Sequence, residues 1–358
     1  MENDMERLEL DYELITPSAR IAATTHGGRA KCLQRLLRLD LPVPRTVAIS
    51  FLGVHSIAAG HFEELLDLLD NFNNDDLLCV RPSSESPDWG GPSAIMNIGM
   101  NDLRHEELKQ KLGADVASSI YIEFIQAYSL HVARLDPDIF NQVDHGSSDA
   151  LPKILEIYES ETEHVFPQDI TVQLSEILRS MARTWESTTA RLLRKAKGAP
   201  IDAGLGLVVQ EMAFGLGEGE SGTGVLQLID ENNGRPKIKG RYTQQSKIIP
   251  KSSSKCTLYL TKDVRGLSLE DNNEKIFRQL VDFATLMRIK LREEMQIEFS
   301  IQNGILHILD GIKTPRKSQA AVRVAVTLAE DGIISRSEAM MRIEPRAISE
   351  LLHRQIDP

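Results

Sequence analysis

The sequence predicts a mixed α/β protein of two or three domains, and three of its features support this fold class. Short runs rich in β-branched residues, such as TVAIS at residues 46–50, alternate with segments whose apolar residues have helical spacing. Residues 103–197 read almost entirely as helix, and QIEFSIQNGILHILDG alternates around an Asn-Gly pair as a β-hairpin does. With 358 residues, the chain is also longer than one ordinary hydrophobic core requires.

The first hundred residues alternate between helix and strand. After Gly27 and Gly28, RAKCLQRLLRLDL places its leucines at helical spacing, and LPVPR ends that helix before the strand at residues 46–50. FEELLDLLDNF is the next helix. The apolar run at residues 77–80 then predicts a buried strand, with Arg81 at its end before a loop of Pro, Ser, Gly and Trp.

The second half of the chain contains most of the remaining strand signals. GLVVQEMAF and GVLQLID flank the glycine-rich segment GLGEGESGTG, residues 215–224, which we interpret as a hairpin loop. A polar stretch with few signals, a strand TLYLT and a helix near IFRQLVDFATLMRIKLREE lead to the hairpin described above. In the helical tail, Ser335 with Glu338 forms a capping box, and Pro345 suits the first turn of a final helix.

Composition and charge argue against several classes of protein. The formal charge of −11 disfavours nucleic acid and anionic membranes as main partners, because phosphate backbones are bound by basic surfaces. Three scattered cysteines fit neither a disulfide framework nor a metal motif. The acidic start MENDMERLELDYEL lacks the apolar core of a signal peptide, and no apolar run approaches the roughly 18 residues of a membrane span. We therefore expect a cytoplasmic protein.

Arg81 is the first candidate site residue. A guanidinium at a strand end, before a loop of small residues, is typical of an anion site because it binds phosphate or carboxylate with two hydrogen bonds. The alternative is an arginine paired with a surface acid.

Two glycine-containing turns are candidates for phosphate contacts. Residues 217–222 spell G-x-G-x-x-G, but a strand follows where the dinucleotide motif needs a helix, and the Walker A sequence is absent. A loop that folds over phosphates and a merely flexible turn both remain possible, and the acidic Glu218 and Glu220 disfavour phosphate unless they point away. In TTHGG, His26 is either a phosphoryl carrier or, as we expect, an ordinary loop residue.

Taken in order, these segments resemble the N-terminal nucleotide-binding part of the pyruvate phosphate dikinase and phosphoenolpyruvate synthase family. GGRAKCLQRLLRLDLPVPRTVAIS is similar to the family's Gly-Gly-Lys turn, helix, Leu-Pro-Val-Pro and strand. VRPSSESPDWGGPSAIMNIGMND, FPQDITVQLSEILRSMARTWESTTARLLRK, VVQEMAFGLGEGESGTGV and MQIEFSIQNGILHILDG match later stretches, and AAVRVAVTLAEDGIISRSEAMMRIEPRAISELLH matches the last helices. The match runs nearly end to end and stops at residues 353–358, where the family continues into a phosphohistidine domain. The chain is thus a fragment or a stand-alone relative.

The resemblance implies an ATP-grasp fold in which Mg-ATP lies between two α/β subdomains and phosphoryl groups pass to a histidine on a separate domain. It implies four parts: an N-terminal subdomain (1–105), a helical insertion (106–199), a second ATP-grasp part with the glycine-rich hairpin loop and the later hairpin (200–312), and a C-terminal helical pair (313–358).

The resemblance also assigns roles to individual residues. Arg81 falls on a phosphate-contacting arginine, Arg29 on the lysine of the Gly-Gly-Lys turn, and Glu298 on a metal-binding glutamate. The remaining predicted nucleotide contacts are Gly217, Gly219, Gly222, Thr223, Gly224 and Gln296.

At several positions where the resemblance implies a role in phosphoryl transfer, this sequence has a different residue. Gln296 replaces an aspartate, and Asp310 replaces a glutamine. Ile122 and Glu123 stand where arginines are expected, and TQQSKIIPK replaces a Gly-Glu-Asp stretch. Because phosphoryl transfer depends on cations that cancel phosphate charge, the sequence predicts weakened chemistry.

Asp310 compensates if it shares Mg²⁺ with Glu298, since this hard cation prefers carboxylates; the alternative is two solvated acids. A three-residue hairpin loop ending at Gly304 places both carboxylates on one polar face with Gln296, and leaves Ile305 and Leu309 on the core face. We expect this longer loop.

Three functions follow as hypotheses. The first is an ATP-binding phosphotransferase module that works with a phosphohistidine domain. The second is a degenerate ATP-grasp protein with a regulatory or scaffold role. A third, an ATP-grasp ligase, is disfavoured because no added acceptor site is recognisable.

Overall fold

The computed structural model describes residues 11–61, 65–217, 219–245, 255–263 and 266–352, and the chain divides into two compact units. Unit 1 comprises Met1–Gln34 and Pro44–Met212, and unit 2 comprises Arg35–Val43 and Ala213–Pro358. Most of the predicted acidic start, most of TQQSKIIPK and the last six residues lie outside the described residues. Within the described part of the chain, no helix combines the length and apolarity needed to span a bilayer.

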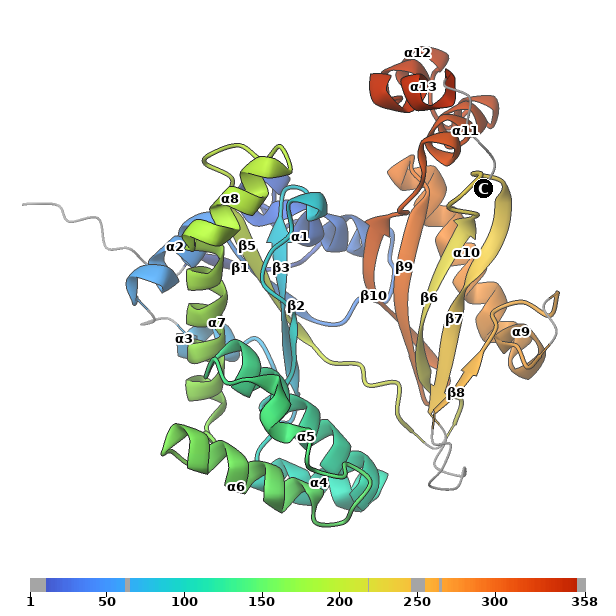
Figure 1. Cartoon of the computed structure of the whole chain (residues 1–358). Coiled ribbons are helices and arrows are strands. Elements are labelled where there is room, and N and C mark those ends of the chain that lie inside the picture. Colours follow the sequence, from blue (N-terminus) through green and yellow to red (C-terminus); the bar gives the residue numbers. More distant parts are fainter. Residues whose placement is uncertain (1–10, 62–64, 218, 246–254, 264–265, 353–358) are drawn as a thin grey trace, which may run out of the picture. The chain divides into compact units, whose positions relative to one another are not determined.

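Unit 1 contains a five-stranded antiparallel sheet with the strand order β1-β2-β5-β3-β4 (Figure 1). Its strands are β1 (Tyr12–Leu14), β2 (Thr46–Ile49), β3 (Leu78–Ser84), β4 (Ile95–Ile98) and β5 (Leu205–Glu211). The predicted strand at 46–50 is thus present, and all its residues are buried because β2 lies inside the sheet. Helices α1 (Ala23–Leu37), α2 (Phe51–Ala59) and α3 (Leu65–Leu69) and the 3₁₀ turn η1 (Pro87–Trp89) connect these strands.

The predicted helical insertion is confirmed. Between β4 and β5 the structure contains only helices and loops: α4 (Asp102–Leu112), α5 (Ala114–His131), η2 (Pro137–Phe140), α6 (Ala150–Thr162), α7 (Ile170–Glu186) and α8 (Thr188–Ala196). Its core is an aromatic cluster in which Phe166 packs edge-on against Phe124, Tyr128 and Tyr158, with ring centroids 5.2–5.5 Å apart. Such contacts fix the helices relative to each other in a way that aliphatic packing alone does not.

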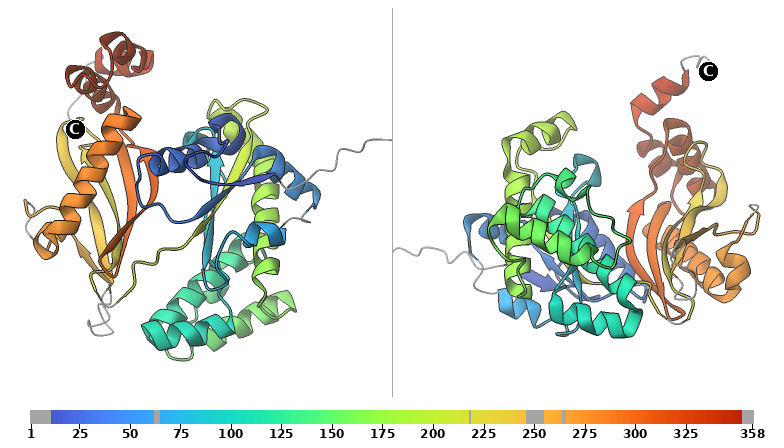
Figure 2. Two further views of the ribbon diagram at one scale, coloured as in Figure 1. Left: turned by 180° about the vertical axis from the view of Figure 1, so that it is seen from behind. Right: turned by 60° about the horizontal axis from the view of Figure 1, so that its bottom comes forward.

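Unit 2 contains a second antiparallel sheet, with the strand order β10-β9-β6-β7-β8. Its strands are β6 (Gly222–Ile229), β7 (Pro236–Gln245), β8 (Lys255–Leu258), β9 (Met295–Gln302) and β10 (Ile305–Lys313). Helix α10 (Glu274–Leu291) lies along one face of this sheet and contacts β6 and β9, and the short α9 (Leu269–Asn272) precedes it (Figure 2).

The topology corrects the interpretation of the glycine-rich segment. Strands β5 and β6, which flank residues 215–221, belong to different sheets and do not pair, so the segment is not a hairpin loop. The chain leaves unit 1 after Met212 and enters unit 2 at Ala213. Strand β7 also forms within the polar stretch in which the sequence showed few signals.

The C-terminal region contains α11 (Ser318–Glu330), α12 (Arg336–Met341) and α13 (Pro345–Leu352), one helix more than the predicted pair. The Ser335 half of the predicted capping box is present, since the backbone N–H of Glu338 donates to the Ser335 hydroxyl at 3.1 Å, whereas the Glu338 carboxylate pairs with Arg342 at 2.7 Å. Pro345 is the first residue of α13, as expected from its missing N–H. Leu328 and Ile334 pack against Ile229 of β6, which joins these helices to the sheet.

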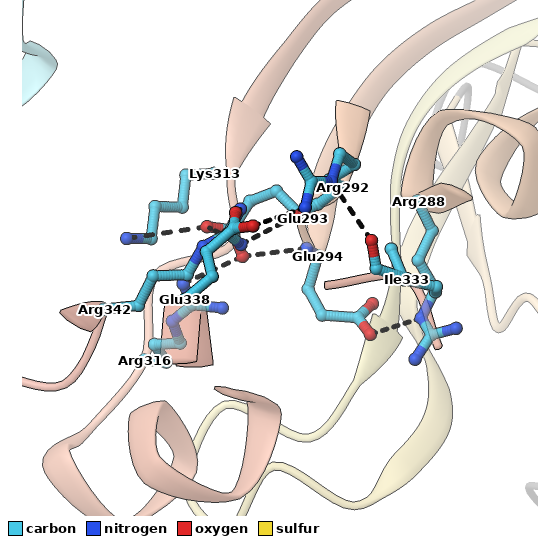
Figure 3. A network of polar contacts seen from close by, with 9 residues as sticks. All are labelled: Arg288, Arg292, Glu293, Glu294, Lys313, Arg316, Ile333, Glu338 and Arg342. Atoms are coloured by element: carbon cyan, nitrogen blue, oxygen red, sulfur yellow. Dashed lines mark hydrogen bonds and ion pairs between the residues drawn. The ribbon is translucent and has the colours of Figure 1, made fainter. Parts of the chain in front are cut away.

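A network of ion pairs joins the same helices to the edge of the second sheet (Figure 3). Glu293, just before β9, contacts Arg316 at 2.9 Å, Lys313 at 3.6 Å and Arg342 at 3.8 Å. The neighbouring Glu294 is 3% exposed and pairs with Arg288 of α10 at 2.5 Å. The network therefore connects α10, β10 and the loop after α12 through two adjacent carboxylates.

Candidate functional site

In unit 1, the candidate site is the contact between the start of α1 and the end of β3. The Ser83 hydroxyl donates to the His26 carbonyl at 2.7 Å and accepts from the Ala30 backbone N–H at 3.1 Å. Gly27 has φ 84°, and a Cβ there would lie 1.6 Å from the Ser83 carbonyl oxygen. Only glycine therefore allows the turn to approach β3 so closely.

Both predicted arginines of unit 1 lie at this contact. The Arg29 guanidinium donates to the carbonyl of Pro82, the residue that follows Arg81. Arg81 pairs with Val208 of β5 and shares a strand face with Ser83, because side chains alternate along a strand. Both arginines are partly buried, so this part of unit 1 combines two permanent positive charges with a glycine turn.

Arg81 is not at the strand end, which corrects the sequence prediction. Strand β3 continues to Ser84 against β5, whereas its pairing with β4 ends at Val80. Beyond Val80 the strand thus has a neighbour on one side only, where a proline lacking an N–H is tolerated.

His26 is helical rather than a loop residue, which corrects the prediction. It lies in α1 before the kink at Gly27, is 6% exposed, and its Nδ1 is 2.8 Å from the Thr25 hydroxyl. Burial lowers the pKa of His26 below its ordinary value, although Asp11 and Glu13 oppose this shift. A neutral, buried imidazole at neutral pH fits a structural role.

In unit 2, the candidate site is the polar face of the sheet. Glu298 of β9 lies opposite Val225 of β6, and Thr223 lies opposite Ser300. On its other side β6 pairs with β7, where Arg241 lies opposite Val225. Residues directly opposite each other on antiparallel strands share a face, so one face presents polar residues from four strands. These residues are Thr223, Gln227, Lys239, Arg241, Thr243, Gln296, Glu298, Ser300, His307 and Asp310.

Glu298 and Asp310 are directly opposite each other, but not through the predicted loop. Asn303 and Gly304 form a two-residue turn with φ 52° and 79°, which corrects the expected three-residue loop. Asn-Gly strongly favours such a turn because both residues tolerate positive φ. The register then shifts between Ile308 and Asp310, so Leu309 is the extra residue of a β-bulge. Because of the bulge, the Asp310 side chain lies on the same face of the sheet as that of Glu298.

The same register corrects the expected core face of β10. Ile305 pairs with Gln302, so it lies on the polar face and is 62% exposed, and the bulged Leu309 also departs from the core positions. Leu306 and Ile308, both nearly inaccessible, occupy the core instead, opposite Ile301 and Phe299.

Several residues around the carboxylate pair are buried. Asp310 is 1% exposed, and its Oδ1 accepts the Gly311 backbone N–H at 2.9 Å. Ser300 is fully buried, and its hydroxyl has no hydrogen-bond partner among the described residues. Burial lowers the pKa of His307, so this imidazole is neutral at neutral pH. The described residues contain no group of three or more metal-ligating side chains, so the pair by itself is an incomplete metal site.

The glycine-rich segment packs against the β9–β10 turn of the same unit. The backbone N–H of Gly304 donates to the Glu220 carbonyl at 2.8 Å, and that of Asn303 donates to the Ser221 hydroxyl at 3.0 Å. The Glu220 carboxylate accepts from the Tyr242 hydroxyl at 2.7 Å and from Gln244 at 3.1 Å. Glu220 is thus held by β7, whereas Glu218 lies outside the described residues.

The predicted glycines differ in what their missing side chains permit. A Cβ on Gly224 would lie 2.5 Å from the Phe299 ring, one on Gly222 would lie 2.7 Å from the Tyr242 ring, and these two rings stack. Both glycines thus serve packing on the core face. A Cβ on Gly217 would lie 1.8 Å from Asn303 Oδ1, whereas Gly219 has more space around it.

Sequence reasoning missed the contribution of β7 to this face. Lys239, Arg241 and Thr243 alternate with Ile238, Gly240 and Tyr242, which is the period of a strand with one polar face. The pattern is weak in the sequence because Gly240 has no apolar side chain at a core position. Its φ is 147°, and a Cβ there would lie 1.9 Å from the Val225 carbonyl oxygen.

Taken together, two antiparallel sheets, a helical insertion and a polar sheet face with opposed carboxylates define an ATP-grasp-like α/β fold. Comparison with known proteins then shows which proteins the chain is similar to. The chain is 27% identical over 376 residues to a pyruvate, phosphate dikinase of Rhizobium meliloti, which covers 93% of this chain. It is 27% identical over 301 residues to that of Clostridium symbiosum and 24% over 366 residues to the chloroplastic protein of Flaveria trinervia.

The chain is therefore a relative of the pyruvate phosphate dikinases, which confirms the resemblance seen in its motifs. It spans 34–42% of the length of these relatives. No family model matches the chain.

Proposed function

We propose that the chain is an ATP-binding phosphotransferase module of the dikinase type. The observation that carries this proposal is the direct opposition of Glu298 and Asp310 on the polar face of the second sheet, in a relative of pyruvate phosphate dikinases. A buried carboxylate such as Asp310 is costly unless hydrogen bonds or cations compensate it, and a shared divalent cation would do so.

The residues fit Mg²⁺ when nucleotide is also present. In nucleotide sites, Mg²⁺ is usually held by one or two protein carboxylates, with phosphate oxygens and water completing its six ligands. A pair without a third metal-ligating side chain matches that requirement. When bound, Mg²⁺ would cancel charge on the phosphates, and Glu298 and Asp310 would fix its position.

The phosphate contacts would come from several segments. Arg29 and Arg81 supply permanent cations in unit 1, as the family resemblance predicts. In unit 2, β6 is paired on both sides, so its backbone amides at Gly222 and Gly224 are used by the sheet. This favours the Thr223 side chain, on the polar face, and the segment with Gly217 and Gly219 as the contacts. Gln296, two residues before Glu298, would contact the nucleotide from the same face.

The acceptor would be a histidine on a separate domain, and transfer would be slow. Ile122, where the family resemblance predicts an arginine, is 4% exposed within α5, so this position has no cation to offer. Losing cations lowers transition-state stabilisation more than it lowers binding, because charge is rearranged only during transfer. A cytoplasmic location remains part of the proposal.

The same observation favours one alternative, a protein that binds nucleotide without transferring phosphate and acts as a regulator or scaffold. The two functions separate in a single set of experiments. Calorimetry with ATP and Mg-ATP measures binding, and labelled ATP with an added phosphohistidine domain of a relative measures transfer. Binding with slow transfer supports the module, and binding without any transfer supports the alternative.

We predict that Glu298→Gln and Asp310→Asn each remove most of the Mg²⁺-dependent gain in ATP affinity. Loss of a charged ligand should cost about 1.5–3 kcal/mol, which is roughly ten- to a hundred-fold in affinity. Glu274→Gln is the matched control, because this acid lies on α10 and pairs only with Arg278 among the described residues. Unchanged Mg²⁺ dependence in both site variants would exclude the paired metal site.

A further inference from the structure

The helical insertion contains a groove that the proposed nucleotide site does not use. The C-terminal ends of α5 and α6 and the middle of α7 enclose it, and its volume is about 540 Å³. All of its lining residues belong to unit 1. Small-molecule sites commonly have volumes of roughly 300–1,000 Å³, so the groove has room for a metabolite.

Three arginines line the groove, and two of them have no acidic partner. Arg134 donates to the hydroxyls of Ser180 at 3.1 Å and Thr184 at 2.7 Å, and these neutral groups are its only acceptors among the described residues. Arg183, one turn along α7 from Arg179, forms no hydrogen bond or ion pair within the described part of the chain. Their positive charges are therefore uncompensated locally.

The backbone of Arg134 is itself unusual. It has φ 62°, in the left-handed region that side-chain-bearing residues rarely occupy, just after the end of α5. Such a conformation is strained and persists where surrounding contacts enforce it. Here it accompanies the hydrogen bonds that hold the guanidinium against α7, at the groove.

The acids of the groove do not cancel this charge. Glu176 accepts the hydroxyl of Tyr128, which holds its carboxylate at the α5–α7 contact, and Glu161 is exposed on α6. Arg134, Arg179 and Arg183 outnumber the two carboxylates. Val132, Ala133 and Leu135 add apolar surface beside the cations.

We infer that this groove is a second ligand site, separate from the proposed nucleotide site, for a small anion with a phosphate or carboxylate group on a short carbon skeleton. Arg134 and Arg183 bind the anionic group, because guanidinium matches both groups with two parallel hydrogen bonds. The apolar side chains of α5 contact the skeleton. An alternative role, in which the arginines only neutralise the C-terminal ends of α5 and α6, predicts no ligand.

The test is calorimetric titration of the whole chain with inorganic phosphate and, separately, with citrate. The wild type should bind at least one of them, and the stronger response identifies phosphate or carboxylate as the preferred group. Arg134→Ala and Arg183→Ala should each weaken that binding about tenfold or more. Arg191→Ala is the matched control, since this arginine lies on α8 and pairs with Glu186.

Two further measurements separate the groove from the nucleotide site. Arg81→Ala should leave the groove titration unchanged, and Arg183→Ala should leave Mg-ATP affinity unchanged. Arg183→Glu provides a second test with little risk to folding, because the exposed side chain has no partner among the described residues; circular dichroism monitors the fold. The inference is overturned if the wild type binds neither anion at millimolar concentration, or if the arginine variants lose only thermal stability.

Discussion

At the scale of single residues, Ser83 and Gly27 determine where the cations of unit 1 lie. The Ser83 hydroxyl joins two segments by bonding the His26 carbonyl and the Ala30 N–H, and Gly27 permits the approach. Arg29 then reaches the carbonyl next to Arg81. Contacts between uncharged residues thus bring Arg29 to the backbone beside Arg81, although the two arginines are far apart in sequence.

Arg81→Ala should weaken Mg-ATP binding by about 1.5–3 kcal/mol if the arginine contacts phosphate, because a charge-assisted hydrogen bond is lost. Calorimetry measures the affinity, and chemical denaturation measures the stability of the variant. Arg45→Ala is a suitable control, since its guanidinium donates only to the Asn71 carbonyl among the described residues. An Arg81 variant that is destabilised but binds Mg-ATP normally would make the arginine structural.

His26 should make stability depend on pH. Because burial lowers its pKa in the folded state below the ordinary value of about 6.5, the unfolded chain takes up a proton first as pH falls. The contribution of neutral His26 is therefore complete above pH of about 6.5 and declines below it, by at most about 1.4 kcal/mol per pH unit. Denaturation of the wild type and of His26→Asn between pH 7.5 and 5.5 should show a smaller decline in the variant. Equal declines would assign the pH dependence to other groups.

At the scale of elements, the bulge in β10 determines which side chains face the site. The two-residue turn fixes the pairing from Ile305 to Ile308, and the extra residue Leu309 shifts every later partner by one position. Without the shift, alternation would place Asp310 on the core face, where an unpaired carboxylate costs several kcal/mol. One residue thus decides whether Asp310 lies opposite Glu298 or on the apolar core face of the sheet.

Deleting Leu309 should preserve the pairing of Asp310 with Glu298 and hence the Mg²⁺-dependent affinity for ATP. The deletion brings Asp310 directly after Ile308, where regular alternation places it opposite Glu298. Calorimetry should show the Mg²⁺ dependence of the wild type, and Asp310→Asn provides the reference for a lost site. A deletion variant that folds but behaves like Asp310→Asn would mean that the bulge geometry itself is required.

At the scale of the whole molecule, the chain crosses between units more than once, and only some crossings are visible in the sequence. Residues 35–43 belong to unit 2 although α1 begins in unit 1, and the chain returns to unit 2 after Met212. Within unit 2, the C-terminal helices depend on the sheet through the Glu293 network and the contact of Leu328 with Ile229.

Glu293→Ala should lower the free energy of unfolding of unit 2 by about 2 kcal/mol. It leaves Arg316 without its 2.9 Å partner, next to Lys313 and Arg342, and like charges then repel. The loss is less than the roughly 3–5 kcal/mol of a fully buried pair because Glu293 is 17% exposed and partly screened. Amide exchange should increase in α11 and α12 and should respond to salt.

Glu274→Ala is the control for this prediction. Its partner Arg278 is 72% exposed, so the pair should contribute only about 0.3–0.5 kcal/mol. If both variants lose the same small amount, the network does not hold the C-terminal helices.

The sequence by itself determined the features that depend on neighbouring residues. The Ser335–Glu338 cap, Pro345 at the start of a helix, the helical insertion and the strands around Asn303-Gly304 all follow from local hydrogen bonding and side-chain period. The family resemblance, confirmed by comparison, also came from motifs in order. Local signals suffice here because the interactions involved span only a few residues.

Only the tertiary structure decided which strands pair and which residues share a face. A glycine-rich segment allows either a hairpin or a change of sheet, and long-range pairing placed β5 and β6 in different sheets. The bulge at Leu309 and the polar side of β7 likewise depend on partners distant in sequence. Strand pairing is decided by the burial of a whole sheet face against its neighbours, and no local pattern contains that information.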